Sequence, residues 1–176
     1  MHFKDEYLKK VSFCGPCWHR IKRAQQQMVQ STPTIGIACD ASCIEGNGTK
    51  KRDGYFHGVT EWQAVDLSTG EIVIKSGRHE QGTINTAEFL AIVGSLRYLH
   101  SLGQYTTPVY SDSKITINWV RQKETRTALP RNEFTEPVLD DLEEALHWLR
   151  KTEIENPVIW WNQHKFGTMP ADFGRK

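Results

Sequence analysis

The stretch IGIACDASCIEG, residues 35–46, decides how the rest of the chain is interpreted. Its pattern predicts a buried strand that is interrupted near its middle by Asp40 and followed by a turn-rich loop of small residues. An isolated ionised carboxylate in an apolar environment costs many kcal/mol, so such a group must be paired, hydrogen bonded or bound to a metal. Asp40 therefore predicts partners elsewhere in the chain.

Length and composition indicate an ordinary globular protein with one main core. The chain has 176 residues, of which 38% are hydrophobic and 24% are charged. No apolar run approaches the roughly 18 residues of a membrane-spanning helix, and the N-terminus lacks the apolar block of a secretory signal. Four clustered cysteines do not suggest a disulfide framework. We therefore expect a monomeric cytoplasmic protein that does not associate with membranes.

The charge is distributed unevenly, although the net charge is only +1. Residues 1–34 carry six Lys or Arg and two acidic residues, so they stand at +4, and the rest of the chain stands at −3. Residues 1–33 are predicted to form a basic, partly helical N-terminal extension, with a helix over Phe3–Val29 that ends before Pro33. This basic arm either contacts a polyanion or is a solvated helix with an ordinary mixture of charges.

The extension contains the sequence CGPC at residues 14–17. This motif resembles the redox motif of thioredoxins, but it lacks the preceding strand and the βαβ framework that the motif needs. A zinc site built from Cys14, Cys17, His19 and a further ligand such as His2 is a second interpretation, although no second pair of ligands completes it. A turn of packed or idle thiols is the favoured interpretation.

The chain after Asp40 predicts two more strands and then a helix. The loop over residues 45–53 leads into a β-rich run over residues 55–66, a turn at residues 68–70 and a third strand over residues 71–79. Short turns make these three strands an antiparallel meander. Apolar residues then recur at helical spacing over residues 85–102, so one face of that helix packs on the sheet.

The second half alternates strands and helices. We expect a strand over residues 108–110, a helix over 114–123, a polar loop over 124–132, an amphipathic helix over 136–151 and a last strand over 158–161. The predicted fold is therefore α/β: a five-stranded mixed sheet, made of a meander of three strands plus two parallel strands, flanked by helices.

Four acidic residues are expected at strand ends and helix starts, where functional groups of open sheets gather. They are Asp40, Glu88 in the first turn of its helix, Asp112 at the end of a strand, and Asp172 after the last strand. Four like charges repel unless cations lie between them, and oxygen ligands suit Mg²⁺. Two such ions roughly 4 Å apart clamp the attacking and leaving oxygens of a phosphoryl displacement.

Each of these residues also has an interpretation without catalysis. Asp112 alone is most simply a helix cap, and Glu88 alone is a first-turn carboxylate favoured by the helix dipole. His164 alone is a surface histidine. Trp119, Trp160 and Trp161 are more often core residues than stacking platforms.

The order of these motifs resembles the ribonuclease H family of RNA–DNA hybrid endonucleases, and specifically its type 1 members. The matching segments are CDASCIEGNG around Asp40, TINTAEFLAI around Glu88, YSDSKITINWV around Asp112, and the terminal HKFGTMPAD with His164 and Asp172. The resemblance covers residues 34–176, which would form the ribonuclease H-like catalytic domain.

The resemblance implies a role for each matching residue. Asp40, Glu88, Asp112 and Asp172 would hold two Mg²⁺ ions, with Mn²⁺ as a possible substitute, and His164, on a mobile loop, would assist proton transfer or product release. Water would attack an RNA phosphodiester, leaving a 5′-phosphate and a 3′-hydroxyl. Further substrate contacts are implied for four residues: Ala41 and Ser42 at RNA 2′-hydroxyls, and Thr83 and Asn85 at a phosphate of the DNA strand.

Some features depart from the family pattern. Ile84 stands where Asn is frequent, the segment TRTALPRN lacks a Lys-rich extra helix, and the chain stops four residues after Asp172. The basic N-terminal arm could replace the missing helix in binding hybrid. Two alternative functions stay open: another nuclease of the same fold, such as a resolvase or 3′-exonuclease, and a binding module that has lost turnover.

Overall fold

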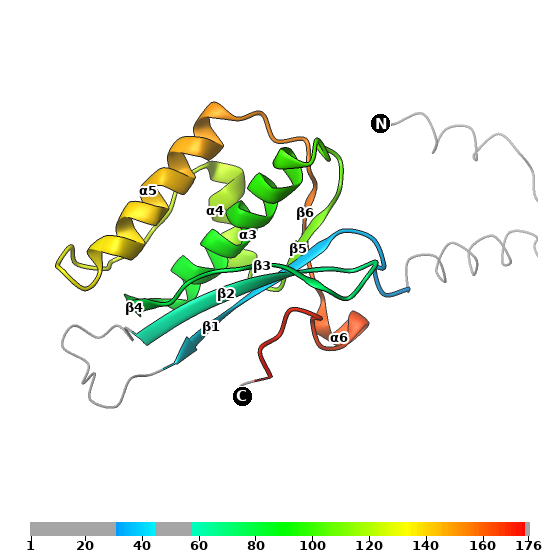
Figure 1. The fold of residues 1–176 in the computed structure, drawn as a ribbon, viewed down its shortest axis with the longest axis horizontal. Helices are drawn as coiled ribbons and strands as arrows, with labels where there is room; N and C mark the ends of the chain where they lie inside the picture. The colour runs from blue at the N-terminus through cyan, green and yellow to red at the C-terminus, as the bar shows by residue number, and fades with distance from the viewer. Residues whose placement is uncertain (1–30, 45–57, 175–176) are drawn as a thin grey trace, which may run out of the picture. The chain divides into compact units, whose positions relative to one another are not determined.

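Strand β1 (Ile37–Ile44) contains Asp40 and lies in the middle of a mixed sheet (Figure 1). The computed structural model describes residues 31–44 and 58–174, and the sheet and its helices belong to the unit that begins at Pro33. The helix predicted over Phe3–Val29, the CGPC segment and the loop over residues 45–53 lie outside the described residues.

The sheet has the predicted mixed topology. Five strands follow in the order β3-β2-β1-β5-β6, with β2 (Gly58–Asp66) and β3 (Ile72–Lys75) antiparallel to their neighbours. On the other side of β1, β5 (Val109–Ser111) and β6 (Val158–Trp160) are parallel to it and to each other. The prediction of a three-stranded meander plus two parallel strands is therefore confirmed.

The third strand is broken where the sequence predicted one continuous strand over residues 71–79. The structure has β3 and then a separate β4 (His79–Gly82), and both pair with β2. Between them, the Ser76 hydroxyl accepts a hydrogen bond from the Trp62 amide at 2.8 Å, so a side chain replaces a ladder carbonyl. This side-chain hydrogen bond, next to Gly77, interrupts the regular pairing with β2. The chain pairs with β2 again in β4, which is a sixth, short strand.

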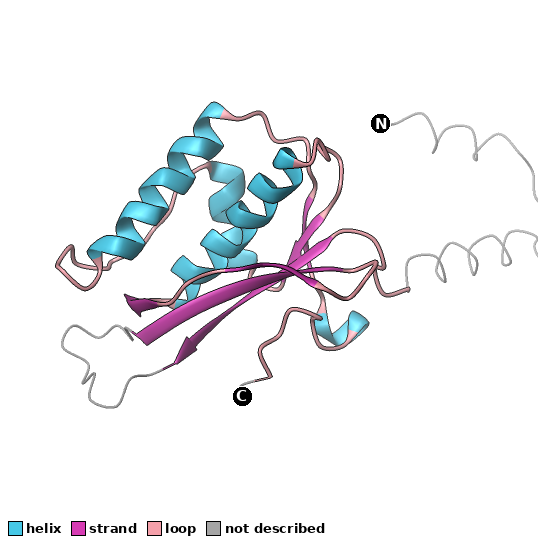
Figure 2. Ribbon diagram, in the orientation of Figure 1, coloured by secondary structure: helices cyan, strands magenta, loops and turns pink. Residues whose placement is uncertain are grey.

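Three long helices cover one face of the sheet, and the C-terminal segment covers the other (Figure 2). The helices are α3 (Ile84–Ser101), α4 (Lys114–Gln122) and α5 (Glu136–Lys151), and the main hydrophobic core lies beneath them. A smaller core under α6 (Gln163–Phe166) and the residues after it includes Trp161, Met169 and Ala171. None of the helices in the described part of the chain has both the length and the apolar character needed to cross a bilayer.

Helix α3 approaches the sheet closely because it carries a glycine at the contact. A Cβ atom on Gly94 would lie 2.3 Å from Cη2 of Trp62 in β2. The helix begins at Thr83, whose hydroxyl accepts from the Thr86 amide while the Thr86 hydroxyl accepts from the Thr83 amide. The cap fixes where α3 starts, and the contact at Gly94 fixes how closely the helix packs on the sheet. Together they position the residues of α3 that face β1.

We expect Gly94→Ala to destabilise the protein by about 1–2 kcal/mol, measured by urea unfolding. Alanine gains up to about 1 kcal/mol of helix propensity, but the new methyl group must displace the Trp62 ring, and overpacking of this kind costs about 1–3 kcal/mol. Gly77→Ala is the control, because a Cβ there meets nothing within 4 Å. Equal stabilities of the two variants would contradict the close packing of α3 on β2.

Candidate metal centre

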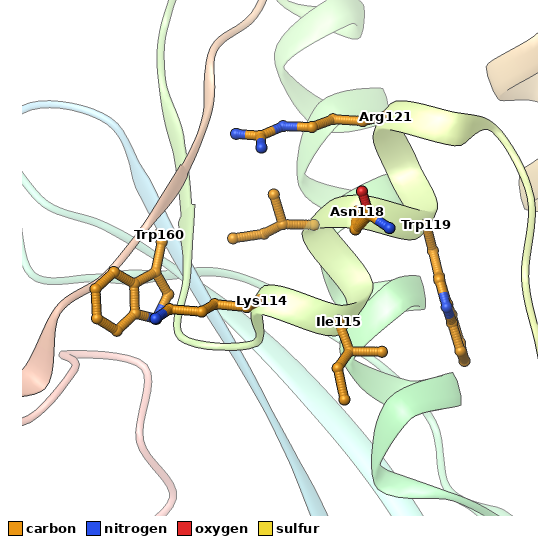
Figure 3. Close-up of a pocket in the computed structure, with 7 residues that line it drawn as sticks. Lys114, Ile115, Asn118, Trp119, Arg121 and Trp160 are labelled. Atoms are coloured by element: carbon orange, nitrogen blue, oxygen red, sulfur yellow. The ribbon is translucent and has the colours of Figure 1, made fainter.

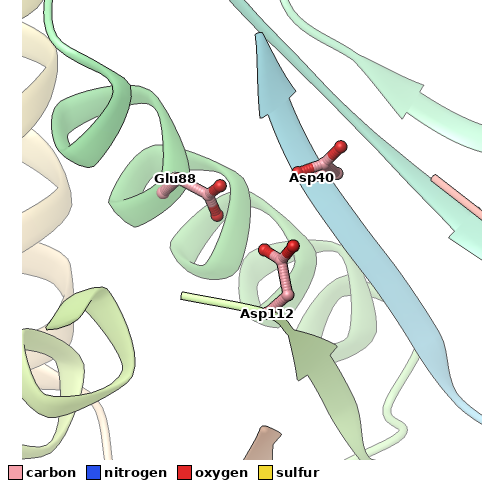
Figure 4. Close-up of side chains that lie close together, drawn as sticks. All are labelled: Asp40, Glu88 and Asp112. Carbon is pink, nitrogen blue, oxygen red and sulfur yellow. The ribbon is translucent and has the colours of Figure 1, made fainter. Parts of the chain in front are cut away.

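Three carboxylates from three different elements converge at one point of the sheet (Figure 4). Asp40 comes from β1, Glu88 from α3 and Asp112 from the residue after β5. Each offers a carboxylate oxygen, and these oxygens all lie within 4.8 Å of one another. The intervening residues include four whole strands, β2 to β5, and most of helix α3, so only the folded chain brings the three carboxylates together.

The register of the sheet places Asp40 beside Asp112. Strands β1 and β5 are parallel, with Ile37 opposite Val109 and Ala38 opposite Tyr110. Continuing this register by two residues aligns Asp40 with Asp112, just beyond the last paired residues. The two carboxylates therefore occupy the carboxyl end of β5, where parallel strands of open sheets carry their functional groups.

Glu88 is the most buried member of the cluster, with 6% of its surface exposed. The expectation that it lies in the first turn is wrong: α3 begins at Ile84, so Glu88 is in the second turn and the first turn has no acidic residue. Its position is therefore not explained by the helix dipole, which acts mainly on the first turn. Burial, followed by the charges of Asp40 and Asp112, raises the pKa of the Glu88 carboxyl well above its usual range.

Asp112 is not the cap of the helix that follows it, which corrects the interpretation of this residue as a capping aspartate. Ser113 is the N-cap of α4 and its hydroxyl accepts from the Thr116 amide at 3.4 Å. The Asp112 carboxylate is held instead by Gln163, whose Nε2 donates to Oδ2 at 2.6 Å. The indole Nε1 of Trp160 donates to the Asp112 carbonyl oxygen at 3.0 Å, so β6 and α6 both fix this residue.

Two of the residues that orient the cluster, Ser111 and Gln163, were not identified from the sequence. The buried Ser111 hydroxyl donates to Oε2 of Glu88 at 3.3 Å and also accepts from the Ser113 amide. The signal for Ser111 was its place directly before Asp112 at a strand end. Gln163 had no local signal, because its partner Asp112 is 51 residues away.

Asp172 is not part of the three-carboxylate group, but its segment is anchored on the strand face that Asp40 shares. Gln63 lies directly opposite Asp40 in the antiparallel register of β1 and β2, so their side chains are on one face. Its Nε2 donates to the carbonyl oxygen of Ala171 at 2.8 Å. This buried link, also not identified from the sequence, holds the residue before Asp172 against the sheet. Asp172 itself is half-buried, and its Oδ1 accepts from the Gly174 amide.

His164 lies in the four-residue helix α6 and not on the loop that the sequence predicted. Its side chain is exposed, and it follows Gln163, the residue bonded to Asp112. The helix forms because amides of residues 165–167 bond back to the carbonyls of Asn162 and Gln163. His164 is therefore adjacent in sequence to the residue that holds Asp112, but it is not one of the three converging groups.

The four residues expected to contact substrate occupy two places. Ala41 and Ser42 follow Asp40 in β1; Ala41 is buried, with 8% exposure, and Ser42 is half-buried. Thr83 and Asn85 flank the start of α3, where the Thr83 hydroxyl is used in the cap. The start of a helix presents backbone N–H groups, which suits an anion.

The donor set fits a hard divalent cation. Carboxylate oxygens are the ligands that Mg²⁺ and Mn²⁺ prefer, and three of them at this spacing repel one another unless a cation lies among them.

The neighbouring thiol of Cys39 is fully buried, and burial followed by the Glu88 charge raises its pKa well above its ordinary value. It therefore stays protonated at neutral pH and donates to the Tyr110 carbonyl at 3.4 Å.

No family model matches the sequence. Similar solved structures include the N-terminal RNase H domain of Rv2228c from Mycobacterium tuberculosis, at 15% identity over 73% of this chain and 87% of that chain, with a TM-score of 0.43. RNase H1 from Halobacterium salinarum is 17% identical over 74% of this chain and 86% of that chain, with a TM-score of 0.42. An RNase H1 isolated from compost is 16% identical over 76% of this chain and 87% of that chain, with a TM-score of 0.47.

These similar structures are all ribonuclease H proteins, the family that the sequence motifs resemble. Their identities to this chain are 15–17% and their TM-scores are below 0.5. The function of this chain is therefore inferred from its own residues.

We expect Glu88→Gln to stabilise the metal-free protein at neutral pH by about 1–3 kcal/mol. The folded-state pKa of Glu88 is raised, so below the ordinary value of about 4.3 both the folded and the unfolded states are protonated and the variant gains nothing. As the pH rises from that value towards the raised folded-state pKa, the unfolded glutamate ionises while the buried one stays protonated, so the wild type loses stability relative to the variant. Above the folded-state pKa the difference levels off. The gain should therefore grow with pH, measured by urea unfolding in a chelator between pH 4 and 8.

Glu155→Gln is the matched control, because Glu155 is exposed. Its stability difference from the wild type should be small, because an exposed side chain makes few contacts. A Glu88→Gln variant that is less stable than the wild type by the same amount at every pH would contradict the electrostatic interpretation of the cluster.

Proposed function

We propose that this protein is an endoribonuclease that hydrolyses the RNA strand of RNA–DNA hybrids and depends on divalent metal ions. The observation that carries the proposal is the convergence of Asp40, Glu88 and Asp112 within 4.8 Å, at the end of a parallel strand pair. Such a cluster is costly without a cation, and oxygen-only sites of this kind serve phosphoryl transfer. The ordered motifs around these acids favour hybrid as the substrate.

The residues of the site would divide the work between holding metal and moving protons. Asp40, Glu88 and Asp112 would bind Mg²⁺, or Mn²⁺ in its place, and Asp172 would complete the set for a second ion. When bound, the two ions would activate a water and stabilise the charge that develops on the phosphate. His164, exposed beside Gln163, would exchange protons with the departing 3′-oxygen or help release the product.

Ser111 and Gln163 would keep the carboxylates oriented before substrate arrives. Each donates a hydrogen bond to one carboxylate oxygen: Ser111 to Oε2 of Glu88, and Gln163 to Oδ2 of Asp112. Outer groups of this kind keep ligand geometry constant, and their loss typically costs about 10–100-fold in activity or metal affinity.

The products of the proposed reaction would be a 5′-phosphate and a 3′-hydroxyl.

Discrimination between RNA and DNA would come from the segment that follows Asp40. Ala41 and Ser42 have small side chains, which would let the 2′-hydroxyls of the strand that is cut approach β1. Thr83 and Asn85, at the start of α3, would receive a phosphate of the DNA strand. The Thr83 hydroxyl already caps the helix, so backbone amides and Asn85 would supply most of this contact.

Incubation of the full chain with Mg²⁺ and labelled RNA–DNA hybrid is expected to cut only the RNA strand, at internal positions. Asp40→Asn should lower the rate by at least about 100-fold, because it removes one of the charged groups that would hold the metal ions. Asp66→Asn is a matched control on the neighbouring strand: Asp66 is at the end of β2, and its carboxylate accepts from Ser68 in a turn.

The same assay separates the alternatives. Cleavage of a four-way junction or of DNA ends in preference to hybrid would indicate another nuclease of this fold. Hybrid binding without cleavage in Mg²⁺ and in Mn²⁺ would indicate a binding module and would overturn the proposal.

We expect Asp172→Asn to lower the cleavage rate and to raise the Mg²⁺ concentration that gives half-maximal activity, each by about 10-fold or more. Gln63→Leu should shift the same two quantities in the same direction but less, because it releases the segment before Asp172 from β2. Unfolding in urea provides the check on folding. If Asp172→Asn left both quantities unchanged while the hybrid was still cut, Asp172 would not belong to the metal-binding set.

A further inference from the structure

An open groove of about 620 Å³ lies between helix α4 and strand β6 (Figure 3). It is lined by Lys114, Ile115, Ile117, Asn118, Trp119, Arg121 and Trp160. Ile117 and Trp119 are buried, whereas Lys114, Asn118 and Arg121 are exposed. The lining residues include two cations and no acid, in contrast to the neighbouring metal centre.

The groove is joined to the metal centre through Trp160. Its indole Nε1 donates to the carbonyl oxygen of Asp112, and the ammonium of Lys114 lies 3.8 Å from the centroid of its ring. A cation held over an aromatic face has a defined position, unlike the free end of a surface lysine. Lys114 is also only two residues after Asp112, at the first position of α4. The ammonium is therefore held over the indole that is itself bonded to the main chain of Asp112.

A second cation continues the line along α4. Arg121 is seven residues after Lys114, so the two positions are about 10 Å apart along the helix axis. Its Nη2 donates to the Val158 carbonyl oxygen at 3.2 Å, which orients the guanidinium and leaves other donors for a ligand. In a nucleic-acid duplex each strand carries a phosphate about every 3.4 Å of helix axis, so this spacing corresponds to roughly three phosphates.

We propose that this groove binds the sugar–phosphate backbone of the strand that is cut, with Lys114 contacting a phosphate adjacent to the scissile one and Arg121 a phosphate further along. The proposal rests on the proposed function, because it takes the carboxylate cluster as the place of the scissile phosphate. The cut strand is favoured over its complement because Lys114 is adjacent to Asp112, and successive phosphates of one strand are neighbours on that scale. Phosphates of the complementary strand lie across a groove of about 6–12 Å.

Lys114 and Arg121 would therefore be binding residues that set affinity and register, and not catalytic residues. The ring of Trp160 would hold the Lys114 ammonium in place and pack against a sugar. This assignment supplies a cationic track on the described part of the chain itself, separate from the basic N-terminal arm.

The test measures hybrid affinity of the full chain in a chelator, so that binding is observed without cleavage. Lys114→Met should weaken binding by about 5–10-fold at low salt and reduce the slope of log Kd against log salt concentration by roughly one. Lys114→Arg should restore most of the affinity, because it keeps the charge and the contact with Trp160. Lys75→Met is the control, since Lys75 is exposed in β3, at the opposite edge of the sheet.

A neutral phosphate identifies the contact directly. Hybrids that carry one methylphosphonate are compared between the wild type and Lys114→Met, and the position is moved along each strand in turn. At the contacted phosphate, the modification should weaken the wild type but not the variant. The proposal is supported if this difference between the wild type and the variant occurs at a phosphate next to the cleavage site in the RNA strand. It is overturned if the difference occurs only in the DNA strand or at no position.

Cleavage by the wild type in Mg²⁺, measured in parallel, separates the two proposals. Cleavage without any effect of Lys114→Met on binding would overturn the groove and leave the nuclease proposal intact. Binding that depends on Lys114, without cleavage, would overturn the nuclease proposal and leave the groove as a nucleic-acid surface. If the wild type neither bound hybrid in the chelator nor cut it in Mg²⁺, both would be wrong.

Discussion

The mutual repulsion of three carboxylates is the constraint on which the arrangement of this fold depends. Asp40, Glu88 and Asp112 are brought within 4.8 Å, and one of them is almost fully buried. The hydrogen bonds from Ser111 and Gln163 offset part of this repulsion, and the hydrophobic contacts of α3 with the sheet must offset the rest. The main core beneath α3 lies directly beside the cluster, and the glycine contact at Gly94 keeps that helix close. The stability of the core thus maintains a destabilising site, as is usual where function requires strain.

The two faces of the sheet contribute differently to the site. The helical face supplies Glu88 and carries most of the apolar burial. The opposite face has a small core, and there Gln63 bonds to Ala171 and Gln163 bonds to Asp112. A third link, from Trp160 to Asp112, comes from β6, where Trp160 packs against the main core. Hydrogen bonds from the C-terminal segment therefore adjust a cluster that the helical face holds in place.

Patterns that depend on near neighbours were predictable from the sequence, and those that depend on distant partners were not. The alternation around Asp40 and the helical period after Asn85 predicted β1, α3 and the order of the sheet. The break at Ser76 was missed because it comes from a side chain that bonds across to Trp62. The Glu88 and Asp112 alternatives failed for a local reason: Thr83 and Ser113 are the caps, and each displaces the acid from the role that position alone suggested. The roles of Gln63 and Gln163 could not be predicted, because their partners are distant in the sequence and are brought close only by folding.

The parallel pairing of β1 with β5 also determines when the site can exist. Ile37 pairs with Val109 across more than seventy residues, whereas β2 and β3 pair across a short turn. The entropy of closing a loop rises with its length, so the meander is expected to form before β5 docks. Asp112 therefore joins Asp40 and Glu88 only as the chain completes its fold, and the repulsion is met after most of the apolar surface is already buried. A chain assembled in this order meets its least favourable charges last, so altering them changes chiefly how fast the protein unfolds and hardly how fast it folds.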